Sequence, residues 1–170
     1  KERALADLRA DTSAVSRWSR LLDLWCAGWF WQQGPPPDRA TFAELNAAIL
    51  RDRSSLPAAI AADLLSRSDA IAQERRFLHW PLAFPEVFTT EPGNPAAAPG
   101  FDAVLGNPPW DMIRGDSGSD DDRRSRRLLA GQLTAFARES GVYRVETRAH
   151  LNRYQLFVER ALQLTRAGGR

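Results

Sequence analysis

The chain of 170 residues has few of several residue types, and each scarcity limits what the protein can be. Its single cysteine, Cys26, excludes an internal disulfide and predicts a small buried hydrophobe in a reducing, cytoplasmic setting. The only histidines are His79 and His150, and the sequence contains no Cys/His cluster, so a metal site is not expected. His79 is expected to be packed and hydrogen-bonded. The densest apolar stretch, residues 21–31, contains Asp23 and falls far short of the ~20 residues of a membrane span.

The charge balance is nearly even and does not by itself indicate a partner. The net charge is +2, with 44% apolar and 26% charged residues, as is typical of a soluble domain with a sizeable core. Lys1 is the only lysine among 23 basic residues. Arginine forks suit phosphates, but genome composition gives the same bias, so it does not distinguish a nucleic-acid partner.

The first 76 residues predict helices. An apolar stripe at helical spacing predicts a helix that begins after the capping side chains of residues 11–13 and ends at the Gly-Pro-Pro-Pro of residues 34–37. The capping-box spacing of Thr41 and Glu44 predicts a second helix, and residues 54–57 separate it from a third. Helical spacing favours core packing of the stripe over a stacking platform for bases. The stripe is Val15, Trp18, Leu22, Trp25 and Trp29; the expected inward residues of the later helices are Phe42, Leu45, Ile49, Ile60, Leu64 and Ile71.

The remaining residues predict part of an α/β sheet. Prolines in the aromatic run 77–88 argue against a regular helix and favour an extended segment, before a surface loop at 89–100. Residues 101–106 predict a short buried strand. After a polar loop and a helical stretch at 128–140, residues 149–166 predict an amphipathic helix that leads into another strand. Its expected inward residues are Tyr154, Phe157, Val158, Ala161 and Leu162.

The tetrapeptide Asn107-Pro108-Pro109-Trp110 directly follows the predicted strand, and ligands bind at such strand ends in open α/β sheets. This pattern arises by chance in a chain this long with a probability on the order of 10⁻³. The Asn107 side-chain oxygen and the Pro108 carbonyl are two acceptors for the hydrogens of an exocyclic amino group, whose nitrogen they would make more nucleophilic. Trp110 offers a flat face for a base taken out of its stack. The alternative is a proline-rich turn with a buried tryptophan.

Residues 101–110 resemble the catalytic motif of amino-methyltransferases, in the Asn-Pro-Pro-aromatic form of gamma-class adenine-N6 enzymes. Residues 77–88 and 150–170 are similar to the flanks of this motif in large restriction–modification methylases of type IIG. The resemblance implies a Rossmann-like sheet, S-adenosylmethionine as methyl donor, double-stranded DNA as substrate and a bacterial cytoplasmic enzyme of restriction–modification or phage defence. By the motif, Asn107 and Pro108 bind the adenine amino group, Pro109 shapes the wall shared by base and cofactor, and Trp110 stacks on the flipped base in place of the commoner tyrosine.

The resemblance also implies that these residues are one part of a larger enzyme. The family's glycine-rich loop for S-adenosylmethionine precedes the catalytic motif, and residues 1–100 contain no match to it. We therefore expect residues 1–76 to be a helical insertion and residues 77–170 to be part of the catalytic core. The cofactor-binding half and the target-recognition domain are expected elsewhere in the same polypeptide, and the 170-residue chain alone is expected to be inactive.

Other interpretations remain open at this stage. Asn-Pro-Pro-aromatic loops also occur in methyltransferases that act on protein glutamine or on RNA bases. A non-catalytic helical scaffold or DNA-binding module is a further alternative. Four clustered arginines, followed downstream by a helical stretch, are expected either to contact DNA phosphates or to pair with the neighbouring residues 120–122. They are Arg123, Arg124, Arg126 and Arg127.

Overall fold

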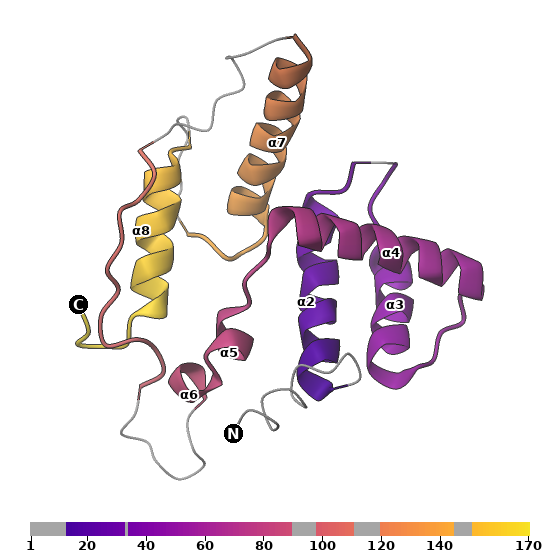
Figure 1. Cartoon of the computed structure of the whole chain (residues 1–170), viewed down its shortest axis with the longest axis horizontal. Helices are drawn as coiled ribbons and strands as arrows, with labels where there is room; N and C mark the ends of the chain where they lie inside the picture. Colours follow the sequence, from indigo (N-terminus) through magenta and orange to yellow (C-terminus); the bar gives the residue numbers. More distant parts are fainter. Residues whose placement is uncertain (1–12, 33, 90–97, 111–119, 145–150) are drawn as a thin grey trace. The chain divides into compact units, whose positions relative to one another are not determined.

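The computed structural model describes residues 13–32, 34–89, 98–110, 120–144 and 151–170. Within these ranges the chain forms seven helices, α2 to α8, and divides into two compact units, Lys1–Ala83 and Phe84–Arg170 (Figure 1). Among the described helices, none combines the length and the apolar character that crossing a membrane requires. The expected capping residues Asp11 and Thr12, His150, most of the loop at 89–100 and residues 111–119 lie outside the described residues.

The first unit is built on three helices, α2 (Ala14–Trp29), α3 (Arg39–Arg51) and α4 (Ala58–Arg75), and α2 packs against both others (Figure 1). Side chains cap two of the helix starts: Ser13 accepts from the Ser16 amide at 3.0 Å, and Asp38 accepts from the Thr41 amide at 2.8 Å. The predicted capping box of Thr41 and Glu44 is therefore wrong, because Asp38 already caps this helix. The buried core consists of Leu24, Leu45, Ile49 and Ala61, with Phe42 and Leu64 packed against it.

The apolar stripe predicted on α2 is not the face that packs in the core. Trp18 is 50% exposed, and Val15 and Trp25 are also exposed. The buried face is formed by Leu21, Leu24 and Ala27, which recur at the same helical spacing. Both stripes fit the period of 3.6 residues, so periodicity cannot choose between them. On α4, likewise, Ile60 is exposed and the buried positions are Ala61 and Ser68.

The segment from Phe77 to Phe88 forms two short helices, α5 (Trp80–Ala83) and α6 (Pro85–Phe88), where an extended segment was predicted. Pro81 and Pro85 lie in the first turns of these helices. Amides in a first turn have no intrahelical partner, so a proline there costs no hydrogen bond. The prolines therefore mark helix starts. The expected packing of His79 is confirmed, since its Nε2 lies 2.8 Å from Asp23 Oδ1 on α2 and only 11% of its side chain is exposed.

The second unit contains α6, α7 (Asp120–Glu139), α8 (Arg153–Leu164) and an extended segment at residues 98–110. The aromatic ring of Phe101 lies 5.4 Å from that of Phe84 and 5.3 Å from that of Phe88, so the segment packs on α6. The connection after α7 is tied to α8, because Gln163 Nε2 donates to the Val142 carbonyl at 2.8 Å.

The predicted Rossmann-like α/β sheet is wrong for the residues that the structure describes, which are helical and contain no strand. In place of a sheet, one parallel bridge joins Phe101 and Thr165. The expected burial of the strand is also wrong, since Leu105 is 97% exposed.

The backbone hydrogen bonds explain why the pairing does not extend. The Phe101 amide donates to the Leu164 carbonyl at 2.8 Å, and the Phe101 carbonyl accepts from the Arg166 amide at 3.0 Å. The chain after Arg166 then turns at Gly168, where φ is 80°, and reaches the extended segment again only at Arg170. Arg170 bonds to Asp102 and Val104, both at 2.9 Å. The turn adds residues on one side only, so the register of a ladder is lost.

Candidate functional site

The Asn-Pro-Pro-Trp loop continues the extended segment past its pairing with the residues after α8. Asn107, Pro109 and Trp110 are exposed, and Pro108 is partly buried. Trp110 is 73% exposed, which excludes the alternative of a turn built on a buried tryptophan. The Asn107 residue is exposed, and no hydrogen bond joins its side chain to another described residue. The loop thus presents one amide side chain and one indole face to solvent, on a backbone that two prolines restrict.

Helix α8 supports the loop from one side through Phe157. A Cβ atom on Gly106 would lie 2.7 Å from Phe157 Cζ, closer than carbon atoms tolerate. Only glycine allows the chain to pass the ring at this point without displacing it. The close approach of this segment to the ring of Phe157 therefore fits a glycine at position 106.

A small apolar cavity lies between the loop and α8. Its volume is about 210 Å³, and Pro108 and Phe157 line it. Ligand pockets for cofactors and nucleotides are usually larger, ~300–1,000 Å³. The cavity therefore does not offer a complete site for a nucleoside or a cofactor. The other lining residues are Val104, Gly106, Val158, Ala161, Leu162, Thr165 and Arg170.

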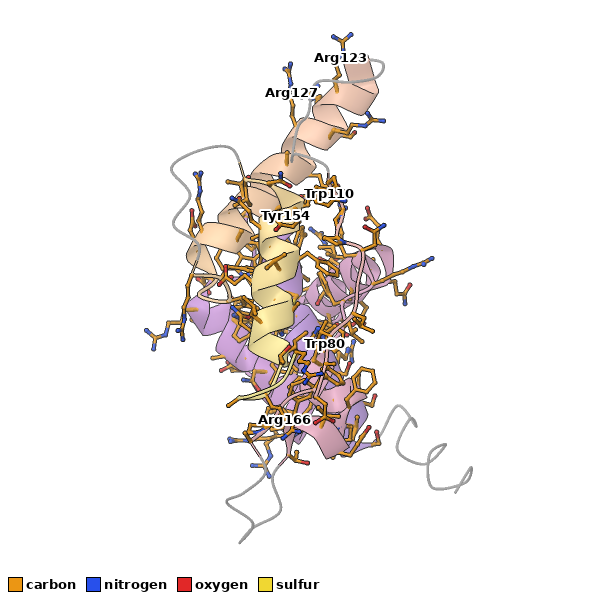
Figure 2. The ribbon with its side chains drawn as sticks, turned by 90° about the vertical axis from the view of Figure 1, so that its left-hand side faces the viewer. Trp80, Trp110, Arg123, Arg127, Tyr154 and Arg166 are labelled. Carbon is orange, nitrogen blue, oxygen red and sulfur yellow. The ribbon has the colours of Figure 1, made fainter. Side chains whose placement is uncertain are left out.

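Trp110 stacks on Tyr154 at the first turn of α8 (Figure 2). The ring centroids are 5.2 Å apart and the planes differ by 10°, the geometry of an offset stack. The start of α8 is fixed by Asn152, whose Oδ1 accepts from the Tyr154 amide at 3.0 Å. Tyr154, Phe157 and Leu162 were predicted to face inward. Tyr154 contacts the loop, and Phe157 and Leu162 line the cavity beside it. All three side chains nevertheless remain partly exposed, and Leu162 is 70% exposed.

The clustered arginines lie exposed on the first turns of α7, where Figure 2 labels Arg123 and Arg127. Helix α7 begins at Asp120, earlier than the predicted helical stretch at 128–140. The side chains of residues 120–122 lie outside the described part of the structure, so the choice between phosphate contact and local ion pairing stays a prediction.

The described residues do not fit a cofactor or metal site. Residues 1–100 contain no sequence match to the glycine-rich loop that holds the phosphates or related groups of nucleotide cofactors at a helix start. Among the described residues, no group of three or more His, Cys, Asp and Glu side chains is placed to bind a metal ion. Cys26 is half-buried, and burial together with the nearby Asp23 carboxylate raises the pKa of its thiol to about 11. This thiol is therefore protonated at neutral pH and is a poor nucleophile.

Comparison with known families decides the class of the protein. The model of the Eco57I restriction-modification methylase family matches residues 7–170. The chain belongs to this family. The match includes the Asn-Pro-Pro-Trp loop, α8 and the described part of the helical unit, so the prediction of a restriction–modification methylase is confirmed. No curated protein and no solved structure gives a significant match to the chain.

Sequence reasoning missed two residues that contact or adjoin this loop, Tyr154 and Gly106. Tyr154 was predicted only as a core residue of α8, and Gly106 only as a strand terminator. The sequence does contain a signal for the position of Tyr154. Asn152 is a favoured N-cap residue, and such a cap places Tyr154 in the first turn of the helix. No sequence pattern indicated that Trp110 would lie against this turn.

Proposed function

We propose that this chain provides the acceptor side of a site-specific DNA adenine-N6 methyltransferase in a restriction–modification or phage-defence system. The observation that carries the proposal is the exposed Asn-Pro-Pro-Trp loop in a member of the Eco57I methylase family. The substrate would be double-stranded DNA, acted on in the bacterial cytoplasm. The methyl group would come from S-adenosylmethionine, held by residues other than those described here.

Asn107 and Pro108 would bind the adenine amino group. The nitrogen is a poor nucleophile, because its lone pair is delocalised into the ring. The Asn107 side-chain oxygen and the Pro108 carbonyl would each accept a hydrogen bond from one hydrogen of the amino group. These two bonds would draw the nitrogen towards tetrahedral geometry. The same two acceptors would stabilise the positive charge that develops as the new N–C bond forms. The extra proton can leave to water afterwards, so no general base is required.

Trp110 would hold the target base outside the DNA double helix. A base must leave its stack before an enzyme can reach its amino group, and this costs a few kcal/mol. Stacking on an aromatic side chain stabilises the extruded base by ~1–3 kcal/mol. Trp110 is well placed for this role because most of its surface is open to solvent. Pro109 restricts the backbone between Pro108, which would bind the amino group, and Trp110, which would stack on the base. Pro109 would also form the wall next to the base.

Substitution of Asn107 tests the proposal. In the intact protein, Asn107→Ala should lower the turnover of methyl transfer to unmethylated DNA by ~10²–10³, the usual effect of removing one preorganised hydrogen-bonding group in a transition state. Turnover is measured as transfer of labelled methyl groups from S-adenosylmethionine to DNA. Asn46→Ala on α3, an equal change in the helical unit, is the control and should leave turnover unchanged.

Full turnover by Asn107→Ala would contradict the proposal. Methyl transfer to a protein or an RNA, but not to DNA, would support the proposed chemistry of the loop and contradict DNA as the methyl acceptor. A protein that transfers no methyl group to any of these would favour a scaffold.

A further inference from the structure

The stacked pair of Trp110 and Tyr154 leaves one indole face free. An offset stack covers one face of each ring, and Trp110 retains 73% of its exposure whereas Tyr154 retains 36%. The face of Trp110 that does not contact Tyr154 is therefore turned to solvent. The tyrosine ring lies behind the surface on which a base would stack.

Tyr154 lies in a capped helix start, and Trp110 follows two residues with a restricted backbone. Tyr154 is in the first turn of α8, where Asn152 bonds to three amides. Its side chain accepts from Tyr154 at 3.0 Å, and its carbonyl accepts from Gln155 at 3.1 Å and from Leu156 at 3.5 Å. Trp110 follows two prolines, whose rings fix φ. An exposed tryptophan on a loop normally samples several rotamers, and ordering it on binding costs free energy. A fixed aromatic partner removes much of this cost in advance.

We propose that Tyr154 is a positioning residue that holds Trp110 in the orientation required to receive the flipped adenine. The bound state is then a stack of three rings, in the order adenine, Trp110, Tyr154. This inference rests on the proposed function, since it assigns the partner of the free indole face. Tyr154 does not touch the reacting atoms and acts only through Trp110.

The test is a set of Tyr154 variants in the intact protein, assayed on unmethylated plasmid DNA with S-adenosylmethionine. Tyr154→Leu should lower kcat/KM by about two- to tenfold, the fold-change equivalent to the loss of one aromatic pair. Tyr154→Phe keeps a ring and should stay within about twofold of the wild type. Tyr154→Gln, a good helix former suited to an exposed site, should show the same loss as Tyr154→Leu and guards against a folding defect of that variant.

A double substitution separates positioning from a structural role. If Tyr154 acts through Trp110, adding Tyr154→Leu to Trp110→Ala should cause no further loss of kcat/KM. A loss of equal size in both backgrounds would overturn the inference, because it would show that Tyr154 serves the helix and not the tryptophan. A gain in kcat/KM for Tyr154→Leu would also overturn it, because the base would then take the place of the tyrosine ring.

The outcome for the wild-type protein distinguishes this inference from the proposed function. If the wild type methylates no adenine in the plasmid, the proposed function fails. If it does methylate adenine, and Tyr154→Leu has the same kcat/KM as the wild type, only the positioning role fails.

Discussion

At the level of single residues, the loop combines exposed functional groups with a restricted backbone. The Asn107 amide faces solvent, and the Pro108 carbonyl lies one peptide further along. Two acceptors on adjacent residues can address the two hydrogens of one amino group. The prolines limit the conformations that the loop must give up when the base arrives. Under this account Asn107 contributes to the chemical step and Trp110 contributes to capture of the base.

The role of Trp110 predicts a difference between two substitutions. Trp110→Ala removes the aromatic face and should reduce transition-state stabilisation by ~1–3 kcal/mol, whereas Trp110→Phe keeps a flat face and should retain much of it. Both are measured as kcat/KM of the intact protein for unmethylated DNA. Equal losses in the two variants would argue against stacking, since they differ mainly in the presence of a ring.

At the level of secondary-structure elements, Gly100 allows the extended segment to pair with the residues after α8. Its φ is 131°, and a Cβ at this position would lie 2.6 Å from the Arg166 amide nitrogen. The Gly100 amide also donates to the Val87 carbonyl of α6 at 3.0 Å. This glycine therefore lies where α6, the extended segment and the chain after α8 meet.

Gly100→Ala should destabilise the second unit by ~1–3 kcal/mol, since the backbone is strained for any residue with a Cβ and the bridge to Thr165 must shift. The measurement is thermal unfolding of the intact protein. Gly131→Ala on α7 is the matched control: nothing lies within 4 Å of its Cβ position, and alanine should stabilise the helix by up to ~1 kcal/mol. An unchanged melting temperature for Gly100→Ala would show that the close approach has no energetic role.

The elements also show what sequence reasoning can and cannot give. The three long helices of the first unit were predicted from breaks and apolar spacing, which are local signals. The predicted end of the first helix at residues 34–37 is wrong, since α2 already ends at Trp29. The buried face of α2 was not predicted, because two stripes share one period and only α3 and α4 select between them. The short helices α5 and α6 were missed because a proline within a run reads as a break, although it is favourable in a first turn.

At the level of the whole molecule, the predicted family is confirmed and the predicted sheet is wrong for the described residues. The family was recognisable because the motif and its flanks are local patterns. The sheet was inferred from one short apolar run and a following amphipathic helix. Whether such a run becomes a strand depends on long-range pairing, and the turn at Gly168 disrupts the register after Thr165. Local sequence does not report this.

The sequence of residues 1–100 predicts how the 170-residue chain behaves towards the methyl donor. Since the family's glycine-rich loop precedes the catalytic motif and residues 1–100 contain no match to it, the chain should bind S-adenosylmethionine poorly. Isothermal titration calorimetry on this chain checks the expectation. Tight binding would show that these residues hold a complete cofactor site, and would contradict the assignment of the chain to the acceptor side alone.

The central claim is that this loop directs a methyl group to the N6 nitrogen of adenine in DNA. The most direct measurement incubates the intact protein with unmethylated DNA and S-adenosylmethionine, digests the DNA and identifies the modified nucleosides by mass spectrometry. We expect N6-methyladenine with the wild type and its loss with Asn107→Ala. A different methylated base, or no methylated base from folded wild-type protein, would contradict the claim.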